Sequence, residues 1–177
     1  MHHLFGTPAE AGAQRKEKNW VPAFAGLTIL LLSSSAFAQE EKQPPYWASI
    51  ASGQAMTHTG PGRNYPNVWL YQRRDLPVRV VKKYENWRQI QDPDGAQGWM
   101  LVTMLSDRRT AIVKPGEPRP IRVGPYDDAK ISARAEAGVV GRISKCNDGW
   151  CRIEIGNRRG YIRISDIWGV GPNEVVD

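Results

Sequence analysis

A pattern of tryptophan, glycine and a second aromatic residue occurs twice in this sequence and constrains the fold more than any other feature. Each copy reads Trp-x-x-Ile, then Gly, an aromatic residue and an apolar residue, and the copies span 87–100 and 150–162. A Gly-Pro pair precedes each tryptophan at almost the same distance, at Gly60 and Gly124. Self-similarity at a fixed period indicates repeated structural units. The sequence therefore predicts two small modules of one fold.

An uncharged run from Val21 to Ala38 follows a short basic segment that contains Arg15 and Lys16. The run ends in Ala36-Phe37-Ala38, which fits the small-residue cleavage pattern of a secretory signal peptide. The alternative is an uncleaved membrane anchor, for which the run is barely long enough, since about 20 apolar residues are needed to span a bilayer. We therefore expect residues 1–38 to be a cleaved signal peptide and the protein to be periplasmic.

Cys146 and Cys151 are the only cysteines, and they bracket Asn147-Asp148-Gly149, a strong turn sequence. On paired strands either side of that turn they could lie close enough to form a disulfide, and an exported compartment permits oxidation. A zinc site and two free thiols are the alternatives. Zinc lacks ligands, because neither module has a histidine in its second half and no other cysteine exists. We expect a disulfide, and no metal or cofactor.

Short β-rich segments separated by turn residues fill most of the chain after the export segment. The expected strands are 76–81, 87–91 and 97–101 in the first module and 139–145, 150–155 and 160–164 in the second. Short strands with regular Gly, Pro, Asp and Asn turns are typical of small barrels or sandwiches. Helical periodicity is absent, so we expect an all-β fold.

The same patterns divide the chain into regions. We expect a disordered lead-in at 39–45, because it is charged and ends in Pro-Pro. A first domain is expected at 46–110, a second at 111–170 and a C-terminal tail at 171–177. Thr110–Val113 leads out of the first domain and is a candidate first strand of the second.

The first domain carries a family resemblance. The turn Thr59–Pro66, the segment around Trp87, the turn Asp92–Gly95 and the segment around Trp99 resemble a bacterial SH3 (SH3b) domain over residues 46–110. A turn motif, two strand motifs and their spacing agree, so the resemblance is specific. It implies a five-stranded, partly open barrel.

Residues 111–170 resemble a diverged repeat of the same domain, in which Val123–Asp128 replaces the full Thr-Gly-Pro-Gly turn. The tandem is similar to small exported SH3-like proteins of Gram-negative bacteria. That similarity implies two barrels that bind peptide or cell-wall polymer and perform no chemistry of their own.

The sequence of the two expected domains contains no recognisable catalytic motif. His58 is the one histidine after the export segment, and it lies in a turn-rich segment away from both cysteines. No G-x-S-x-G or S-x-x-K motif of a serine enzyme occurs there. The acidic pairs Asp92/Asp94 and Asp127/Asp128 lie in turns, where aspartate makes local hydrogen bonds. We therefore expect no catalytic residues and no enzymatic activity.

Strand alternation assigns faces to the repeated tryptophans. Cys151 and Ile153 share one face of their strand, which must point to the core, so Trp150 lies on the other face. The same offset places Trp87 opposite Ile90. The other tryptophans of the predicted domains, which we expect in the core or between the modules, are Trp47, Trp69 and Trp168.

The family resemblance assigns a role to the outward aromatic residues. Trp87 and Trp150 match an aromatic position in the peptide groove of eukaryotic SH3 domains, and Trp99 and Tyr161 resemble a second one. With Tyr65 of the glycine-rich turn, they form the expected ligand-binding set. The alternative is that neighbouring loops or the other module cover these rings, so that they bind nothing.

The chain is basic, with a formal net charge of +6. After the export segment, basic pairs occur at Arg73-Arg74, Lys82-Lys83, Arg108-Arg109 and Arg158-Arg159. Such pairs among aromatic residues would suggest nucleic acid in a cytoplasmic protein, but export argues against it. Acidic partners outside the cytoplasm are peptidoglycan carboxylates, anionic lipid or lipopolysaccharide, and acidic proteins. Dispersed pairs are equally typical of a soluble basic surface.

The sequence therefore predicts an exported, non-catalytic binding module. Its expected partner is a cell-envelope polymer or a periplasmic protein, bound as a peptidoglycan stem peptide or an extended protein segment. The alternative is a structural or assembly protein whose aromatic faces are buried between the modules or in a homodimer.

Overall fold

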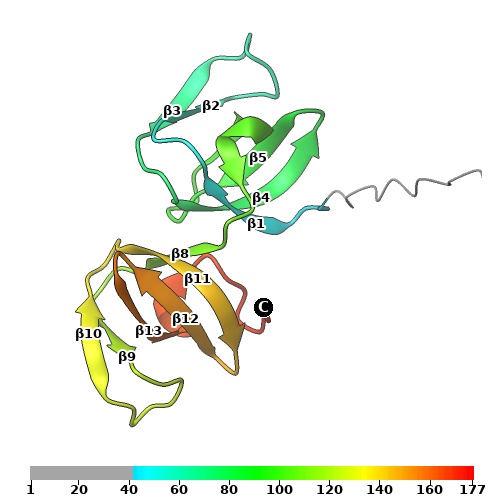
Figure 1. The fold of residues 1–177 in the computed structure, drawn as a ribbon. Coiled ribbons are helices and arrows are strands. Elements are labelled where there is room, and N and C mark those ends of the chain that lie inside the picture. Colours follow the sequence, from blue (N-terminus) through cyan, green and yellow to red (C-terminus); the bar gives the residue numbers. More distant parts are fainter. Residues whose placement is uncertain (1–41) are drawn as a thin grey trace, which may run out of the picture. The chain divides into compact units, whose positions relative to one another are not determined.

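The computed structural model describes residues 42–177 (Figure 1). The signal peptide expected at 1–38 lies outside the described residues, as do the first residues of the expected lead-in. The described part is almost entirely β-structure, in two antiparallel sheets of seven strands each. Its helical segments are two 3-10 turns, η1 (Val102–Met104) and η2 (Ile164–Asp166).

The first sheet curls around a core of its own, and we call it the first barrel (Figure 1). Its strands are β1 (Tyr46–Ile50), β2 (Ala55–His58), β3 (Asn67–Tyr71), β4 (Pro77–Tyr84), β5 (Trp87–Gln91), β6 (Gln97–Leu101) and β7 (Leu105–Ser106). They lie in the order β3-β2-β6-β5-β4-β1-β7. Ile50, Val80, Ile90 and Met100 are fully buried in the core, as the strand alternation around Ile90 predicts.

The second barrel repeats this topology. Its strands are β8 (Thr110–Val113), β9 (Arg119–Arg122), β10 (Ile131–Ala135), β11 (Val140–Asn147), β12 (Trp150–Ile155), β13 (Arg158–Arg163) and β14 (Ile167–Trp168). Their order, β10-β9-β13-β12-β11-β8-β14, matches the first sheet strand for strand. The all-β tandem is therefore confirmed, and Thr110–Val113 is the first strand of the second sheet.

Each barrel has seven strands where five were expected. The difference arises because the segment between the first and fourth strands forms a hairpin of its own. In the first barrel this hairpin is β2–β3, and in the second it is β9–β10. The glycine-rich turns at Gly60 and Gly124 lie in the loops of these two hairpins.

The two cysteines form a disulfide, as the turn between them predicts. Cys146 and Cys151 are direct cross-strand partners on β11 and β12, with their Cα atoms 4.0 Å apart. Asp148 and Gly149 take positive φ values of 50° and 80° in the turn, a conformation that Asn-Asp-Gly sequences adopt readily. Both sulfurs are fully buried in the core of the second barrel.

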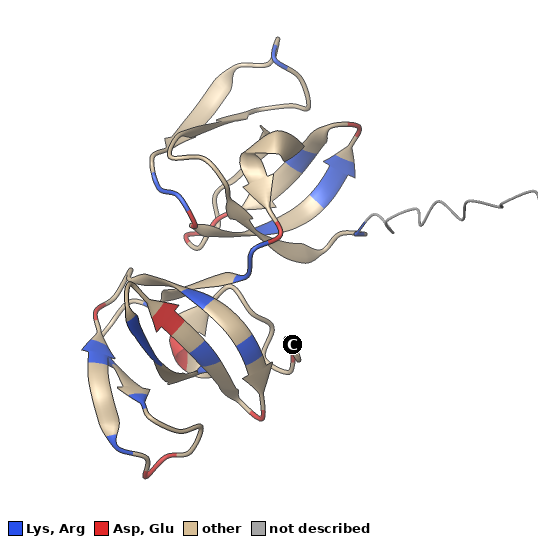
Figure 2. Ribbon diagram, viewed as in Figure 1, with Lys and Arg blue, Asp and Glu red and all other residues tan. Residues whose placement is uncertain are grey.

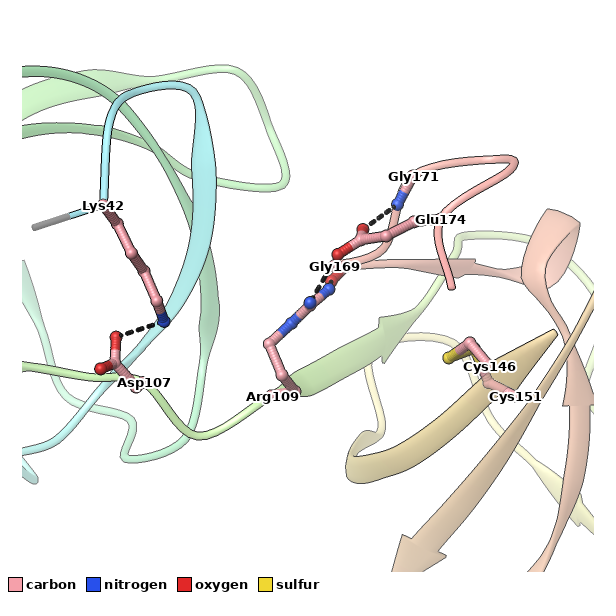
Figure 3. Close-up of polar contacts among 8 residues, drawn as sticks. All are labelled: Lys42, Asp107, Arg109, Cys146, Cys151, Gly169, Gly171 and Glu174. Atoms are coloured by element: carbon pink, nitrogen blue, oxygen red, sulfur yellow. Dashed lines mark hydrogen bonds and ion pairs between the residues drawn. A yellow bond between two sulfur atoms is a disulfide. The ribbon is translucent and has the colours of Figure 1, made fainter. Parts of the chain in front are cut away.

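The C-terminal segment packs beside this disulfide (Figure 3). The backbone N–H of Cys146 donates to the Val176 carbonyl at 2.9 Å, and the Val176 N–H returns a bond to Cys146 at 3.1 Å. Glu174 accepts from Arg109 at 2.5 Å and from the Gly171 N–H at 2.8 Å (Figure 3). Burial acts to raise the pKa of Glu174, but hydrogen bonds from Arg109, Gly171 and Trp47 outweigh it and lower the pKa.

The three tryptophans expected in the core or between modules have two different environments. Residues 40–177 form one compact unit, in which Trp47 of β1 meets Trp168 of β14 edge to face, with ring centroids 4.7 Å apart. These two therefore connect the barrels, as expected. Trp69 is 56% exposed on β3, so the prediction for Trp69 is wrong. The reason is that β3 is the last strand at its edge of the sheet and has no further strand to cover it.

Candidate functional site

Each barrel has a sheet face turned away from its core, built from equivalent positions of four strands. The residues of the first outer face are His58, Arg79, Lys82, Tyr84, Trp87, Gln89, Gln91, Gln97, Trp99 and Leu101. Those of the second outer face, in the same order, are Arg122, Arg142, Lys145, Asn147, Trp150, Arg152, Glu154, Arg159, Tyr161 and Arg163. These positions alternate with core residues such as Ile90 and Ile153, as strand geometry requires.

Trp87 lies on the first outer face, as predicted, but it is not exposed. Only 7% of its surface is accessible. The His58 ring stands edge to face against the indole, with ring centroids 5.2 Å apart. The expectation of an exposed indole at Trp87 is therefore wrong. Strand alternation determines on which side of the sheet the indole lies, but whether it is exposed depends on side chains of neighbouring strands, here His58 of β2. Trp87 is a supporting ring beneath the surface.

Trp150 has the same position and the same 7% exposure in the second barrel. Its cover is different. The Arg163 guanidinium lies over the ring, 4.7 Å from the centroid, and is also paired with the Asp127 carboxylate. A guanidinium over an indole face is a stabilising cation–π contact. The equivalent tryptophans of the two barrels are thus covered by different side chains, and in each case the covering side chain comes from the same barrel.

Trp99 and Tyr161 are half-buried and occupy the middle of the two outer faces. Trp99 is the cross-strand partner of His58 on one side and Gln89 on the other. Tyr161 holds the equivalent place in the second barrel. Each follows a glycine, and a Cβ on Gly98 would lie 2.7 Å from the Thr57 side chain. The absence of a side chain at Gly98 therefore allows β2 to approach β6 closely, and Trp99 lies next to β2 as a result.

Tyr65 is held at the surface by the glycine-rich loop. It is 43% exposed, and its ring lies so near Gly60 that a Cβ there would be 2.5 Å from the ring. His58 Nδ1 is 3.0 Å from the Tyr65 carbonyl oxygen. Tyr65 therefore adds an accessible ring beside the residue that separates Trp87 from solvent.

Tyr126 is the counterpart of Tyr65 that sequence reasoning missed. A Cβ on Gly124 would lie 2.4 Å from the Tyr126 ring, and the ring is 54% exposed. The distance along the chain differs, since Tyr65 follows its Gly-Pro pair later than Tyr126 does. The shared signal is a Gly-Pro pair followed by a tyrosine at variable spacing.

Tyr71 fixes the end of the β2–β3 hairpin. Its hydroxyl donates to Asp92 at 3.0 Å, and burial together with the nearby charges of Asp92 and Asp94 raises the pKa of Tyr71. Asp92 also accepts hydrogen bonds from the Asp94 and Ala96 N–H groups. This carboxylate therefore holds a turn, as expected from its sequence context.

The described residues 42–177 contain no group of three or more His, Cys, Asp or Glu side chains placed to hold a metal ion. Within the same range, no helix is long and apolar enough to cross a membrane. The side chains of the two outer faces are mainly aromatic rings, amides and guanidinium groups.

The sequence matches the family model of the bacterial SH3 domain twice, over residues 52–107 and 115–169. Similar solved structures include NlpC2 from Trichomonas vaginalis, at 16% identity and a TM-score of 0.32, covering 72% of this chain and 49% of that one. Another is an NlpC/P60 family protein from Bacillus cereus, at 15% identity and a TM-score of 0.32, covering 70% and 56%. The chain spans about half the length of these structures. No curated protein sequence matches it.

Proposed function

The chain belongs to the bacterial SH3 domain family, and we propose that it is an exported, non-catalytic binding module for a cell-envelope ligand. The observation that carries the proposal is a repeated pair of accessible aromatic rings. In the first barrel Trp99 is the cross-strand partner of His58, and His58 Nδ1 is 3.0 Å from the Tyr65 carbonyl oxygen. Tyr161 and Tyr126 are the counterparts of Trp99 and Tyr65 in the second barrel. Aromatic rings that are apolar yet edged by polar groups are typical of binding surfaces.

The ligand that suits this surface is an extended chain, either a peptidoglycan stem peptide or a protein segment. Shallow grooves lined by aromatic rings bind extended peptides, because the rings contact successive side chains while the backbone stays accessible. Trp87 and Trp150 support the surface from below. Gln89, beside Trp99, is half-buried, and its buried Oε1 has no hydrogen-bond partner among the described residues.

Trp99→Ala is expected to weaken capture of the mature protein by purified peptidoglycan sacculi by about tenfold or more, since truncating an aromatic anchor commonly costs about 2 kcal/mol of binding. Tyr65→Ala should act in the same direction. The measurement is co-sedimentation with sacculi, with a thermal melt on each variant to establish that it is folded.

Trp69→Ala is the matched control, because it removes the same side chain from an exposed site on β3, a strand of the same barrel that contributes no residue to the first outer face. It should bind sacculi like the unmodified protein. Equal loss in Trp69→Ala and Trp99→Ala, or folded Trp99→Ala with full binding, would contradict the assignment of the first outer face.

We also propose that the module acts in the periplasm after removal of residues 1–38. The uncharged run 21–38 and its Ala-x-Ala ending support this. N-terminal sequencing of the protein recovered from a periplasmic fraction should begin at Gln39. An intact leader in the membrane fraction would instead establish a retained anchor.

A structural role is the second candidate, and the edge strand β3 is the observation that favours it. Val68, Trp69 and Leu70 are 39%, 56% and 47% exposed on this strand, and an exposed apolar edge is prone to pair with another chain. Sedimentation velocity separates the candidates. A dimer that Trp69→Lys dissociates would support assembly, and a monomer at all concentrations would exclude self-assembly.

A further inference from the structure

The two outer faces share a backbone and differ in charge. At four equivalent positions a side chain of the first face that is neither lysine nor arginine is replaced by arginine in the second. The pairs are His58/Arg122, Gln89/Arg152, Gln97/Arg159 and Leu101/Arg163. Figure 2 shows basic residues on β11 and β12 of the second barrel, with an acidic residue at the end of β12.

These four arginines surround one aromatic ring. Tyr161 is the cross-strand partner of Arg122 on β9 and of Arg152 on β12. Arg159 and Arg163 lie two residues before and after it on β13. Adjacent strands are about 4.8 Å apart and residues i and i+2 of a strand about 7 Å apart, so the backbone positions of all four arginines lie within about 7 Å of Tyr161.

Much of this charge is not neutralised. Arg159 pairs with Glu154 at 3.0 Å and Arg163 pairs with Asp127, but Arg122 donates to the uncharged carbonyl of Ala129. Arg152 is exposed and makes no ion pair with any described residue. Further along the same face, Lys145 is likewise exposed and makes no ion pair with a described residue, whereas Arg142 has Glu154 as its cross-strand partner.

A hollow of about 210 Å³ opens at this arginine cluster. It is lined by Ser144, Arg152, Ile153, Glu154 and Arg159. Ser144 is the extra residue where the register of β11 shifts against β12, between Ile143 and Lys145. The irregularity therefore accompanies a recess bordered by the guanidinium groups of Arg152 and Arg159 and by the Glu154 carboxylate, which pairs with Arg159 through its Nε and leaves the other donors of that guanidinium available. The recess is large enough for a carboxylate or phosphate group.

We propose that the second outer face binds an acidic saccharide. The apolar face of one sugar ring lies on Tyr161, and Arg152 and Arg159 hold a carboxylate or phosphate of the ligand in the hollow. Guanidinium groups suit this task because they bind planar anions through two parallel hydrogen bonds. The proposal rests on the proposed envelope-binding function and assigns a ligand class to the second barrel alone.

Two observations favour a saccharide over a membrane or a simple polyanion. A lipid surface needs apolar side chains that can insert, but the tryptophan of this face, Trp150, is covered by Arg163. The exposed apolar side chains of the second barrel, Val123, Tyr126 and Ile131, lie on the β9–β10 hairpin and do not line the hollow. A simple polyanion needs charge alone, and the ring of Tyr161 at the centre of the cluster would then contribute nothing.

The test uses the mature protein and three soluble polymers of similar length: polygalacturonate, which has a carboxylate on every sugar ring, neutral dextran, and polyglutamate. R152Q/R159Q installs the side chains that the first face has at these positions. It should weaken binding to polygalacturonate by about tenfold or more, since a hydrogen bond to a charged group is worth about 1.5–3 kcal/mol. Arg152 is exposed and unpaired with acid in the described chain, so the variant should fold.

R63Q/R74Q is the matched control, because it removes two arginines from exposed sites of the first barrel that do not belong to its outer face. It should change polygalacturonate binding by less than about twofold, as distant charges are screened in physiological salt. Y161L tests the ring, and should weaken polygalacturonate binding several-fold while leaving any polyglutamate binding unchanged.

Three results would overturn the proposal. The first is R152Q/R159Q binding polygalacturonate as tightly as R63Q/R74Q does. The second is polyglutamate binding as tightly as polygalacturonate, which would mean recognition of charge alone. The third is tighter binding to vesicles containing phosphatidylglycerol, which would mean a membrane surface. The sacculus assay with Trp99→Ala reports on the first barrel, so either proposal can fail without the other.

Discussion

Trp87→Ala is expected to lower the free energy of unfolding of the first barrel by about 3 kcal/mol or more, the usual cost of truncating a buried tryptophan. Trp87 is buried, with 7% of the residue accessible, and the His58 ring packs edge-on against its indole. Removing the indole leaves a cavity between the sheet and the β2–β3 hairpin. A small domain has about 5–15 kcal/mol of stability to lose, so the change should be plain in a urea titration.

Trp69→Ala provides the comparison, because Trp69 is more than half exposed in the same barrel. Its expected effect is within about 0.5 kcal/mol, as for other surface substitutions. If Trp87→Ala unfolded at the same urea concentration as Trp69→Ala, the indole would have to be mobile and accessible in solution. The original interpretation of Trp87 as an open groove residue would then return.

Strand alternation and repetition explain what could be predicted from the sequence. The period of two places Ile90 and Ile153 in their cores, and both are buried. The Asn-Asp-Gly turn brings Cys146 and Cys151 into register, and they are bonded. These features depend on residues close together in the chain or on one strand, where local geometry decides the result.

The cover over each tryptophan could not be predicted, because it depends on contacts between distant segments. His58 reaches Trp87 from the β2–β3 hairpin, whereas Trp150 is covered by Arg163 from the adjacent strand. The pattern around each tryptophan is nearly the same, so it contains no information about this difference. Tyr126 was missed for a related reason, since loop length varies between the two hairpins while the contact of ring with glycine is retained.

The repeated glycine before Trp99 and Tyr161 has a physical reason that the sequence alone does not disclose. Neither Gly98 nor Gly160 adopts a positive φ, so backbone freedom is not what requires glycine here. At both positions a Cβ would meet the neighbouring hairpin strand at well under 3.0 Å. The motif therefore marks the place where the hairpin crosses closely over the sheet and brings the outer-face aromatic residue beside it.

Gly160→Ala is accordingly expected to destabilise the second barrel by about 3 kcal/mol, at the upper end of the usual cost of overpacking. The added Cβ would lie 2.4 Å from Ile121 Cγ2 and 2.7 Å from the backbone oxygen of Arg122. A side chain can rotate away, but the Arg122 carbonyl belongs to β9, so that strand would have to move off β13. Because Arg122 and Tyr161 are register partners, the same shift would pull apart the second outer face.

The measurement is a thermal melt, in which a loss of this size should lower the Tm by about 10 °C or more for a domain of this length. Gly53→Ala is the control, since no atom lies within 4 Å of its added Cβ and Gly53 has no positive φ. It should leave the Tm nearly unchanged. If Gly160→Ala had the same Tm as Gly53→Ala, β9 would be able to move away from β13 with little loss of stability. The Gly-aromatic motif would then need an explanation other than close approach, and the position of Arg122 beside Tyr161 would not be fixed by it.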